Sequence, residues 1–219
     1  MKAWQSIAMG LVVAGGFGGC NTAKESTMAA MAVSTTGNAA GEKIFREGTE
    51  WVQMNIPAAT STNNPRVLLI GDSITAQYFG PVRAQLKGTA YCADLATSAA
   101  VADPVFLKLL EPLFVGYEYA VVQFNNGLHG FDYTDEEYRA GYERALDFIR
   151  QKAPKAKLIL VLSTPVKPGS NADARINPRV DARNTLVKEL AKKMAAEVTD
   201  LHSISQDEPD YYADTYHFK

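Results

Sequence analysis

The chain has few of the residues that carry disulfide or metal chemistry. It contains two cysteines and three histidines among 219 residues, and its formal net charge is −2. This balance gives no positive surface of the kind that nucleic-acid binding requires. The sequence also lacks paired cysteines at zinc spacing, a His-Glu-x-x-His motif, a calcium loop and a glycine-rich dinucleotide or phosphate fingerprint. We therefore expect no metal, no cofactor and no nucleic-acid partner.

Long apolar runs are missing as well, and no segment is long enough to span a bilayer as a mature helix. Near the start, Lys2 precedes an apolar stretch from Ile7 to Phe17 that ends at Gly18-Gly19-Cys20. This pattern predicts an export signal over residues 1–20. The small residues before Cys20 resemble a bacterial lipoprotein cleavage site, so we expect lipidation at Cys20 and anchoring at a membrane only through that lipid. The alternative is ordinary secretion, with cleavage around Ala29 to Ala32.

After the leader, the sequence predicts a tether and one domain. Residues 21–40 are rich in Ala, Ser, Thr and Met without a clear period, which is typical of a flexible segment. The chain is 47% hydrophobic, so residues 41–219 can bury one full core. Cys92 lies in an apolar stretch, which favours a small buried side chain over a reactive thiol.

Strand and helix patterns alternate from residue 66 onward. Val67 to Ile70 is a continuous apolar run, typical of a strand that is buried on both faces. Thr134 and Glu137 have the spacing of a capping box at the start of a helix. Residues 41–54 are consistent with a short helix or an extended arm. The expected strands are Val67–Ile70, Ala90–Leu95, Tyr119–Phe124, Lys157–Leu162 and Glu197–Leu201, and the expected helices are Gln77–Lys87, Pro104–Phe114, Asp135–Lys152 and Pro178–Ala195. This alternation predicts an α/β fold with a mainly parallel sheet and right-handed crossovers.

The first expected strand ends in Gly71-Asp72-Ser73, and the chain ends near Asp214-Thr215-Tyr216-His217. Ligands bind at the carboxyl ends of the strands in open α/β sheets, so Ser73 is well placed for chemistry. A serine hydroxyl needs a base to become a nucleophile. His217, with Asp214 three residues earlier to orient it, is the candidate base. His129 is the rival base, although substrate contact is the favoured role for it; His202 is expected to end the fifth strand in a peripheral place.

These blocks resemble those of the SGNH, or GDSL, hydrolases, a family of esterases, lipases and acyltransferases. The resemblance runs from about Arg66 to His217. It implies a flavodoxin-like three-layer α/β/α sandwich with five strands, a Ser73-His217-Asp214 triad and an oxyanion hole. The family's third block places an oxyanion-hole asparagine at Phe124-Asn125-Asn126-Gly127.

Within that block, Asn125 is the candidate side-chain donor and Asn126 is the alternative. In the family's second block, here Thr97-Ser98-Ala99-Ala100, the backbone donor is expected within Ser98 to Ala100, and we assign it to Ala100. Asp72, Asn126 and His129 are candidates for substrate contact, and for Asp72 a bond to local backbone that shapes the turn is the favoured role.

The sequence therefore predicts an exported serine esterase that acts on a small-molecule or glycan ester, such as an O-acetyl group. The first alternative is an O-acyltransferase on the same triad. A non-catalytic glycan-binding protein and a flavodoxin-like flavin or phosphate binder that uses Ser73-Ile74-Thr75 are further alternatives.

Overall fold

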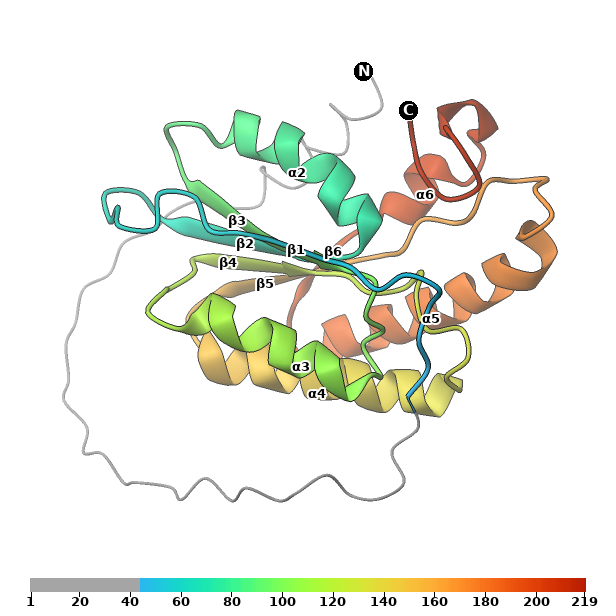
Figure 1. Ribbon diagram of the computed structural model, residues 1–219, viewed down its shortest axis with the longest axis horizontal. Coiled ribbons are helices and arrows are strands. Elements are labelled where there is room, and N and C mark those ends of the chain that lie inside the picture. The colour runs from blue at the N-terminus through green and yellow to red at the C-terminus, as the bar shows by residue number, and fades with distance from the viewer. Residues whose placement is uncertain (1–43) are drawn as a thin grey trace.

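The computed structural model describes residues 44–219 (Figure 1). The predicted export signal, Cys20 and the tether over residues 21–40 lie outside the described residues. Among residues 44–219, no helix is both long and apolar enough to cross a membrane. Cys92 is buried with a free thiol, as predicted, and burial raises its pKa to about 12.

One sheet of six strands forms the middle layer (Figure 1). The strands are β1 (Val52–Asn55), β2 (Arg66–Gly71), β3 (Tyr91–Thr97), β4 (Val121–Phe124), β5 (Lys157–Val161) and β6 (Glu197–Thr199). Their order in the sheet is β1-β3-β2-β4-β5-β6, and every pair is parallel except β1 with β3. The five predicted strands are therefore confirmed in flavodoxin-like order.

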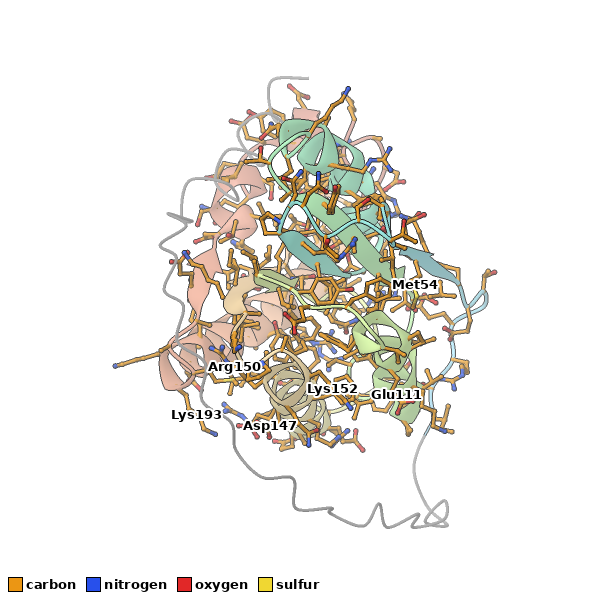
Figure 2. All side chains as sticks on the ribbon, turned by 90° about the vertical axis from the view of Figure 1, so that its left-hand side faces the viewer. Met54, Glu111, Asp147, Arg150, Lys152 and Lys193 are labelled. Atoms are coloured by element: carbon orange, nitrogen blue, oxygen red, sulfur yellow. The ribbon has the colours of Figure 1, made fainter. Side chains whose placement is uncertain are left out.

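The antiparallel edge strand β1 was not predicted as a strand. Three of its four residues are exposed, so the sequence shows no buried period there. Its position follows instead from pairing with β3, in register from Val52 opposite Thr97 to Asn55 opposite Asp94. Figure 2 shows Met54 of this strand at one edge of the molecule.

Helices cover both faces of the sheet. They are α2 (Ser73–Gln85), α3 (Pro104–Leu110) with the 3₁₀ turn η1 (Glu111–Phe114), α4 (Asp135–Lys152), α5 (Asp173–Lys193), α6 (Leu201–Ser205) and the 3₁₀ turn η2 (Pro209–Tyr211). Leu68 and Ile70 of β2 pack in the core shared with α3, α4 and α5, whereas Val67 and Leu69 pack with α2 and α6. The predicted strand buried on both faces is confirmed, and the result is a three-layer sandwich (Figure 1).

The predicted start of α2 is wrong, because Asp72 caps the helix and α2 begins at Ser73, four residues before Gln77. Helix α4 spans the predicted residues, and Thr134 and Glu137 form the predicted capping box. Figure 2 shows Asp147 and Lys193 on the outer side of the helical layer, and both are exposed.

Two predictions at the carboxyl half are wrong. Helix α5 begins five residues earlier than Pro178, which lies inside the helix, because the Asn177 side chain does not cap it but binds the N–H and the carbonyl of Val166. His202 does not end the last strand, since β6 stops at Thr199 and His202 lies in α6.

Candidate active site

Ser73 is the first residue of α2 and follows directly on β2. Gly71 is needed here for space, since a Cβ at this position would lie 2.0 Å from Oγ1 of Thr75. The carboxylate of Asp72 accepts a hydrogen bond from the N–H of Ile74 at 3.0 Å and caps the helix. Asp72 is fully buried and does not line the pocket described below, so its assignment to substrate contact is wrong and its role in the turn is observed. The close strand-to-helix turn places the Ser73 hydroxyl at the carboxyl end of the sheet.

Three predicted residues meet at this point, although they lie far apart in the sequence. Nε2 of His217 lies 2.9 Å from Oγ of Ser73, which is 144 residues away along the chain. Nδ1 of the same imidazole lies 2.9 Å from Oδ2 of Asp214. Each ring nitrogen thus has one partner, which is the arrangement in which a carboxylate orients a base toward a hydroxyl.

Asp214 is held in its charged form by its own turn. Its carboxylate accepts the backbone N–H groups of Tyr216 at 2.7 Å and of His217 at 2.8 Å. Burial acts to raise the pKa of Asp214, but these hydrogen bonds and the imidazole of His217 together lower that pKa to about 2.

A short hairpin fixes the position of His217. Tyr212 pairs with Phe218 across it, their ring centroids lie 4.5 Å apart, and both side chains are buried against α2 and the sheet. The hydroxyl of Tyr212 donates to the carbonyl of Pro165 at 2.8 Å, and the amide of Gln77 on α2 donates to the carbonyl of Phe218 at 3.2 Å. The hairpin therefore ties the Asp214-x-x-His217 segment to the helix that carries Ser73.

A pocket of about 490 Å³ opens beside Ser73 and His217. Three aromatic side chains contribute to its wall, namely Trp51, Phe131 and Tyr216. Charged or titratable groups line it as well, and these are Glu47, His129, Arg175 and His217. The pocket thus combines flat apolar surfaces with a small number of polar groups, as ligand sites do.

One wall of this pocket is a strap, which we define as residues 44–51. The strap is fastened to the loops that follow β3 and β4. The N–H of Phe45 donates to the hydroxyl of Tyr133 at 3.2 Å, Arg46 forms an ion pair with the buried Asp103, and the N–H of Trp51 donates to Oγ of Ser98 at 2.9 Å. These contacts hold Glu47 and Trp51 over the pocket.

His129 lies in the same wall of the pocket. Its Nδ1 is 2.6 Å from Oε1 of Glu47, and its Nε2 has no hydrogen-bond partner among residues 44–219. Burial acts to lower the pKa of His129, but the hydrogen bond to the Glu47 carboxylate and the charges of Asp72, Glu47 and Glu50 raise that pKa overall.

A buried arginine shapes the loop that carries His129. The guanidinium of Arg183 donates to the carbonyls of Gly127 at 2.9 Å, of His129 at 2.8 Å and of Gly130 at 2.9 Å. It also lies between two rings, 4.4 Å from the centroid of Phe131 and 4.2 Å from that of Tyr138. Only 2% of Arg183 is exposed, so this contact sets the path of residues 127–131.

Residues 120–219 match the model of the GDSL-like Lipase/Acylhydrolase family. These residues belong to the GDSL-like hydrolases. The predicted family is confirmed, and with it the prediction of an ester-hydrolysing enzyme.

Solved structures share the fold of this chain. One is the lipase/acylhydrolase from Enterococcus faecalis, with 20% identity, a TM-score of 0.55, and coverage of 71% of this chain and 87% of that chain. An acetyl xylan esterase has 15% identity and a TM-score of 0.55 over 70% of this chain and 91% of its own. A family two carbohydrate esterase from Clostridium thermocellum has 13% identity and a TM-score of 0.53 over 71% of this chain and 58% of its own. No curated protein matches the chain.

The two asparagines of the family's third block have different surroundings in this GDSL-like hydrolase. The amide of Asn125 donates to the carbonyl of Val161 at 2.7 Å and to Oγ of Ser163 at 3.0 Å, so both of its hydrogens are used in the core. The amide of Asn126 donates to the carbonyl of Ala99 at 3.0 Å, and its oxygen accepts from the N–H of Val101 at 2.8 Å. Asn125 as the oxyanion donor is therefore wrong, and one amide hydrogen of Asn126, the alternative, remains available.

Asn126 also places Ala100, because its side chain bridges the residues on either side. Within residues 44–219, the backbone N–H groups of Ala100 and Ser73 donate to no acceptor. Asn126 and Ala100 are buried and do not line the pocket, so a role of Asn126 in binding the parts of a substrate away from its carbonyl is not supported.

Four residues of the site carried no signal in the sequence. Glu47 and Trp51 precede an edge strand without a buried period, while Arg175 and Arg183 read as ordinary surface charges on a long helix. His202 is peripheral as expected, with Nε2 3.0 Å from Asp181 on α5. Among the described residues, no cluster of His, Cys, Asp or Glu has an arrangement that could hold a metal ion.

Proposed function

We propose that this GDSL-like hydrolase is an exported serine esterase with Ser73 as nucleophile, His217 as base and Asp214 as the group that orients the base. The observation that carries the proposal is the continuous chain of contacts from Ser73 Oγ through both nitrogens of His217 to Asp214, at 2.9 Å on each side, beside a pocket. A histidine paired with an aspartate alone is common on protein surfaces. A hydroxyl, an imidazole and a carboxylate in series at a strand end are the groups that acyl transfer requires.

The first half of the reaction forms an acyl-enzyme. Asp214 accepts the Nδ1–H of His217, so Nε2 carries the lone pair that takes the proton from Ser73 as Oγ attacks the ester carbonyl. The imidazolium then gives that proton to the departing alkoxide, and the alcohol leaves. A water molecule repeats the sequence on the acyl-enzyme, which releases the acid and restores Ser73.

Developing negative charge on the carbonyl oxygen needs hydrogen-bond donors. We assign the backbone N–H groups of Ser73 and Ala100 and the remaining amide hydrogen of Asn126 to this role. The support is that these donors have no other acceptor among the described residues and that Asn126 bridges Ala99 and Val101 around Ala100. Each such donor in a serine hydrolase contributes about 3 kcal/mol to transition-state stabilisation.

The proposed substrate is an O-acyl ester, such as an O-acetyl group, on a carbohydrate. The aromatic side chains of Trp51, Phe131 and Tyr216 in the pocket support this class, because they offer flat apolar faces next to polar groups. The acetyl xylan esterase and the carbohydrate esterase that share the fold are consistent with it.

A fluorophosphonate probe tests the nucleophile directly, because it reacts with an activated serine. Labelling followed by mass spectrometry should place the phosphonyl group on Ser73, and Ser73→Ala should prevent labelling. A matched control is Ser203→Ala, since Ser203 is an exposed serine of α6 that does not line the pocket. Labelling at another residue, or retained hydrolysis of a small acetyl ester in Ser73→Ala, would remove this mechanism.

Export and lipidation are proposed from the leader alone. The apolar stretch that ends at Gly19-Cys20 supports lipid attachment at Cys20. Cys20→Ser should then move the protein from the membrane fraction to the soluble fraction. A wild-type protein that is already soluble and begins downstream of Cys20 would show that the chain is secreted without a lipid.

A further inference from the structure

Arg175 is the one charged group in the pocket wall that lacks a described partner. Glu47 and His129 lie against each other, with 2.6 Å between Oε1 and Nδ1, and His217 has Asp214 and Ser73. The Arg175 side chain is exposed, and within residues 44–219 it forms neither an ion pair nor a hydrogen bond through its guanidinium. The pocket that Ser73 lines therefore presents one positive charge that no described acidic side chain pairs with.

The acidic residues of its own helix do not neutralise this charge. The carboxylate of Asp173 accepts the N–H of Gly169 at 2.7 Å and the amide of Asn177 at 2.7 Å. Asp181 lies 3.0 Å from His202, and Glu189 lies 2.9 Å from Arg139. Each of the three carboxylates on α5 therefore has another partner, and none of them forms an ion pair with Arg175.

The other two arginines of α5, Arg179 and Arg183, differ from Arg175 because both have hydrogen-bond partners in the protein. Arg179 donates to the carbonyls of Phe131 and Tyr133 and also contacts Asp135. Arg183 is buried against three carbonyls of residues 127–130. These two arginines bind the loop after β4. The guanidinium of Arg175 donates to no acceptor among residues 44–219.

We infer that Arg175 binds an anionic group on the substrate, and that the enzyme acts on acyl esters whose alcohol part is a carboxylate-bearing sugar. This inference rests on the proposed esterase function of the site and adds the charge of the substrate to it. A guanidinium binds a carboxylate through two parallel hydrogen bonds, so it selects a planar anion over a neutral hydroxymethyl group. The aromatic residues of the pocket take the ring, and Arg175 takes the carboxylate.

The charge belongs to the alcohol part because of the shape of the site. A pocket of about 490 Å³ that is lined by three aromatic side chains is much larger than an acetyl group needs. The acyl carbonyl must lie at Ser73, and the remaining space extends to Trp51, Phe131 and Arg175.

The test compares two acetyl esters that differ only at C6, namely O-acetylated methyl glucuronoside, which carries a carboxylate there, and O-acetylated methyl glucoside, which carries a hydroxymethyl group. We expect kcat/KM of the wild type to favour the glucuronoside. Arg175→Gln should lower kcat/KM for the glucuronoside about tenfold, as for the loss of a solvent-exposed, charge-assisted contact, and leave the glucoside unchanged. Arg175→Lys should retain part of the preference, and the preference should shrink at high salt, because the group is exposed.

Arg144→Gln is the matched control, since Arg144 is an exposed arginine on α4 that does not line the pocket. It should leave both rates unchanged. Equal rates on the two esters in the wild type, or equal losses on both in Arg175→Gln, would overturn the inference. A preference for a hemisuccinate ester of a neutral alcohol, without one for the glucuronoside, would also overturn it.

Binding to Ser73→Ala separates this inference from the proposed function. Saturation-transfer NMR with free glucuronate and glucose requires no hydrolysis. We expect glucuronate to bind more tightly than glucose, and Arg175→Gln in the same background to remove the difference. If Ser73→Ala still hydrolyses esters, the proposed mechanism fails, while this binding experiment still decides the role of Arg175. Equal binding of the two sugars would overturn it.

Discussion

Glu47 and His129 form a second carboxylate–imidazole pair, in the wall of the pocket that His217 also lines. The Glu47 carboxylate lies 2.6 Å from Nδ1 of His129, across 82 residues of sequence. The two pairs differ at the other ring nitrogen. Nε2 of His217 contacts Ser73, whereas Nε2 of His129 has no partner among the described residues. This difference favours His217 over His129 as the base.

The Glu47–His129 pair predicts a pH-dependent pocket wall. The pKa of His129 is raised in the folded protein. The stabilisation that the charged pair gives to the pocket wall is therefore complete below the ordinary histidine pKa of about 6.5, and it is lost as the pH rises through the raised pKa. Glu47→Gln should lower the pKa of His129, which NMR titration of the ring protons measures. KM should rise with increasing pH in both proteins, and this rise should begin at a lower pH in Glu47→Gln than in the wild type. An unchanged titration of His129 would contradict this role for Glu47.

The His217–Ser73 contact predicts that the two residues act as a unit. His217→Ala should lower kcat nearly as much as Ser73→Ala, and the double variant should be little worse than either single variant. Asp214→Asn should be severe but milder, because its loss leaves the base in place without its orienting carboxylate. Steady-state kinetics on a small acetyl ester measures all four variants. A harmless His217→Ala together with a fatal His129→Ala would transfer the base role to His129.

The two asparagines predict opposite kinetic results. Asn126→Ala should lower kcat about 100-fold, since it removes one oxyanion donor and the bridge around Ala100. Asn125→Ala is the matched control, because it also removes two hydrogen bonds of a buried amide but no donor to the substrate. Thermal unfolding should show a similar loss of stability in both variants. If Asn125→Ala had the larger effect on kcat at equal stability, the assignment would reverse.

Which of these features the sequence could predict depends on whether a local pattern marks them. The β2 run, the capping box of Thr134 and Glu137, and the positions of Ser73 and His217 all follow from short segments with a strong pattern. The choice between Asn125 and Asn126 could not be predicted from such a segment, because the two adjacent residues differ only in the neighbours that their side chains reach. The β1 pairing and the Glu47–His129 contact depend on long-range geometry between segments of low intrinsic preference.

The surroundings of Arg183 predict that it positions the substrate-binding loop. Lysine cannot donate to three carbonyls and stack between two rings at once, so Arg183→Lys should leave some of these groups unpaired. We expect KM to rise severalfold with a smaller change in kcat, and the free energy of unfolding to fall by about 2 kcal/mol. The pKa of His129 should also shift, because its loop is released, and NMR titration detects this. Arg139→Lys is the control, since Arg139 forms an exposed pair with Glu189 and such pairs contribute little. A fall in stability without a change in KM or in the titration of His129 would show that Arg183 supports only the fold.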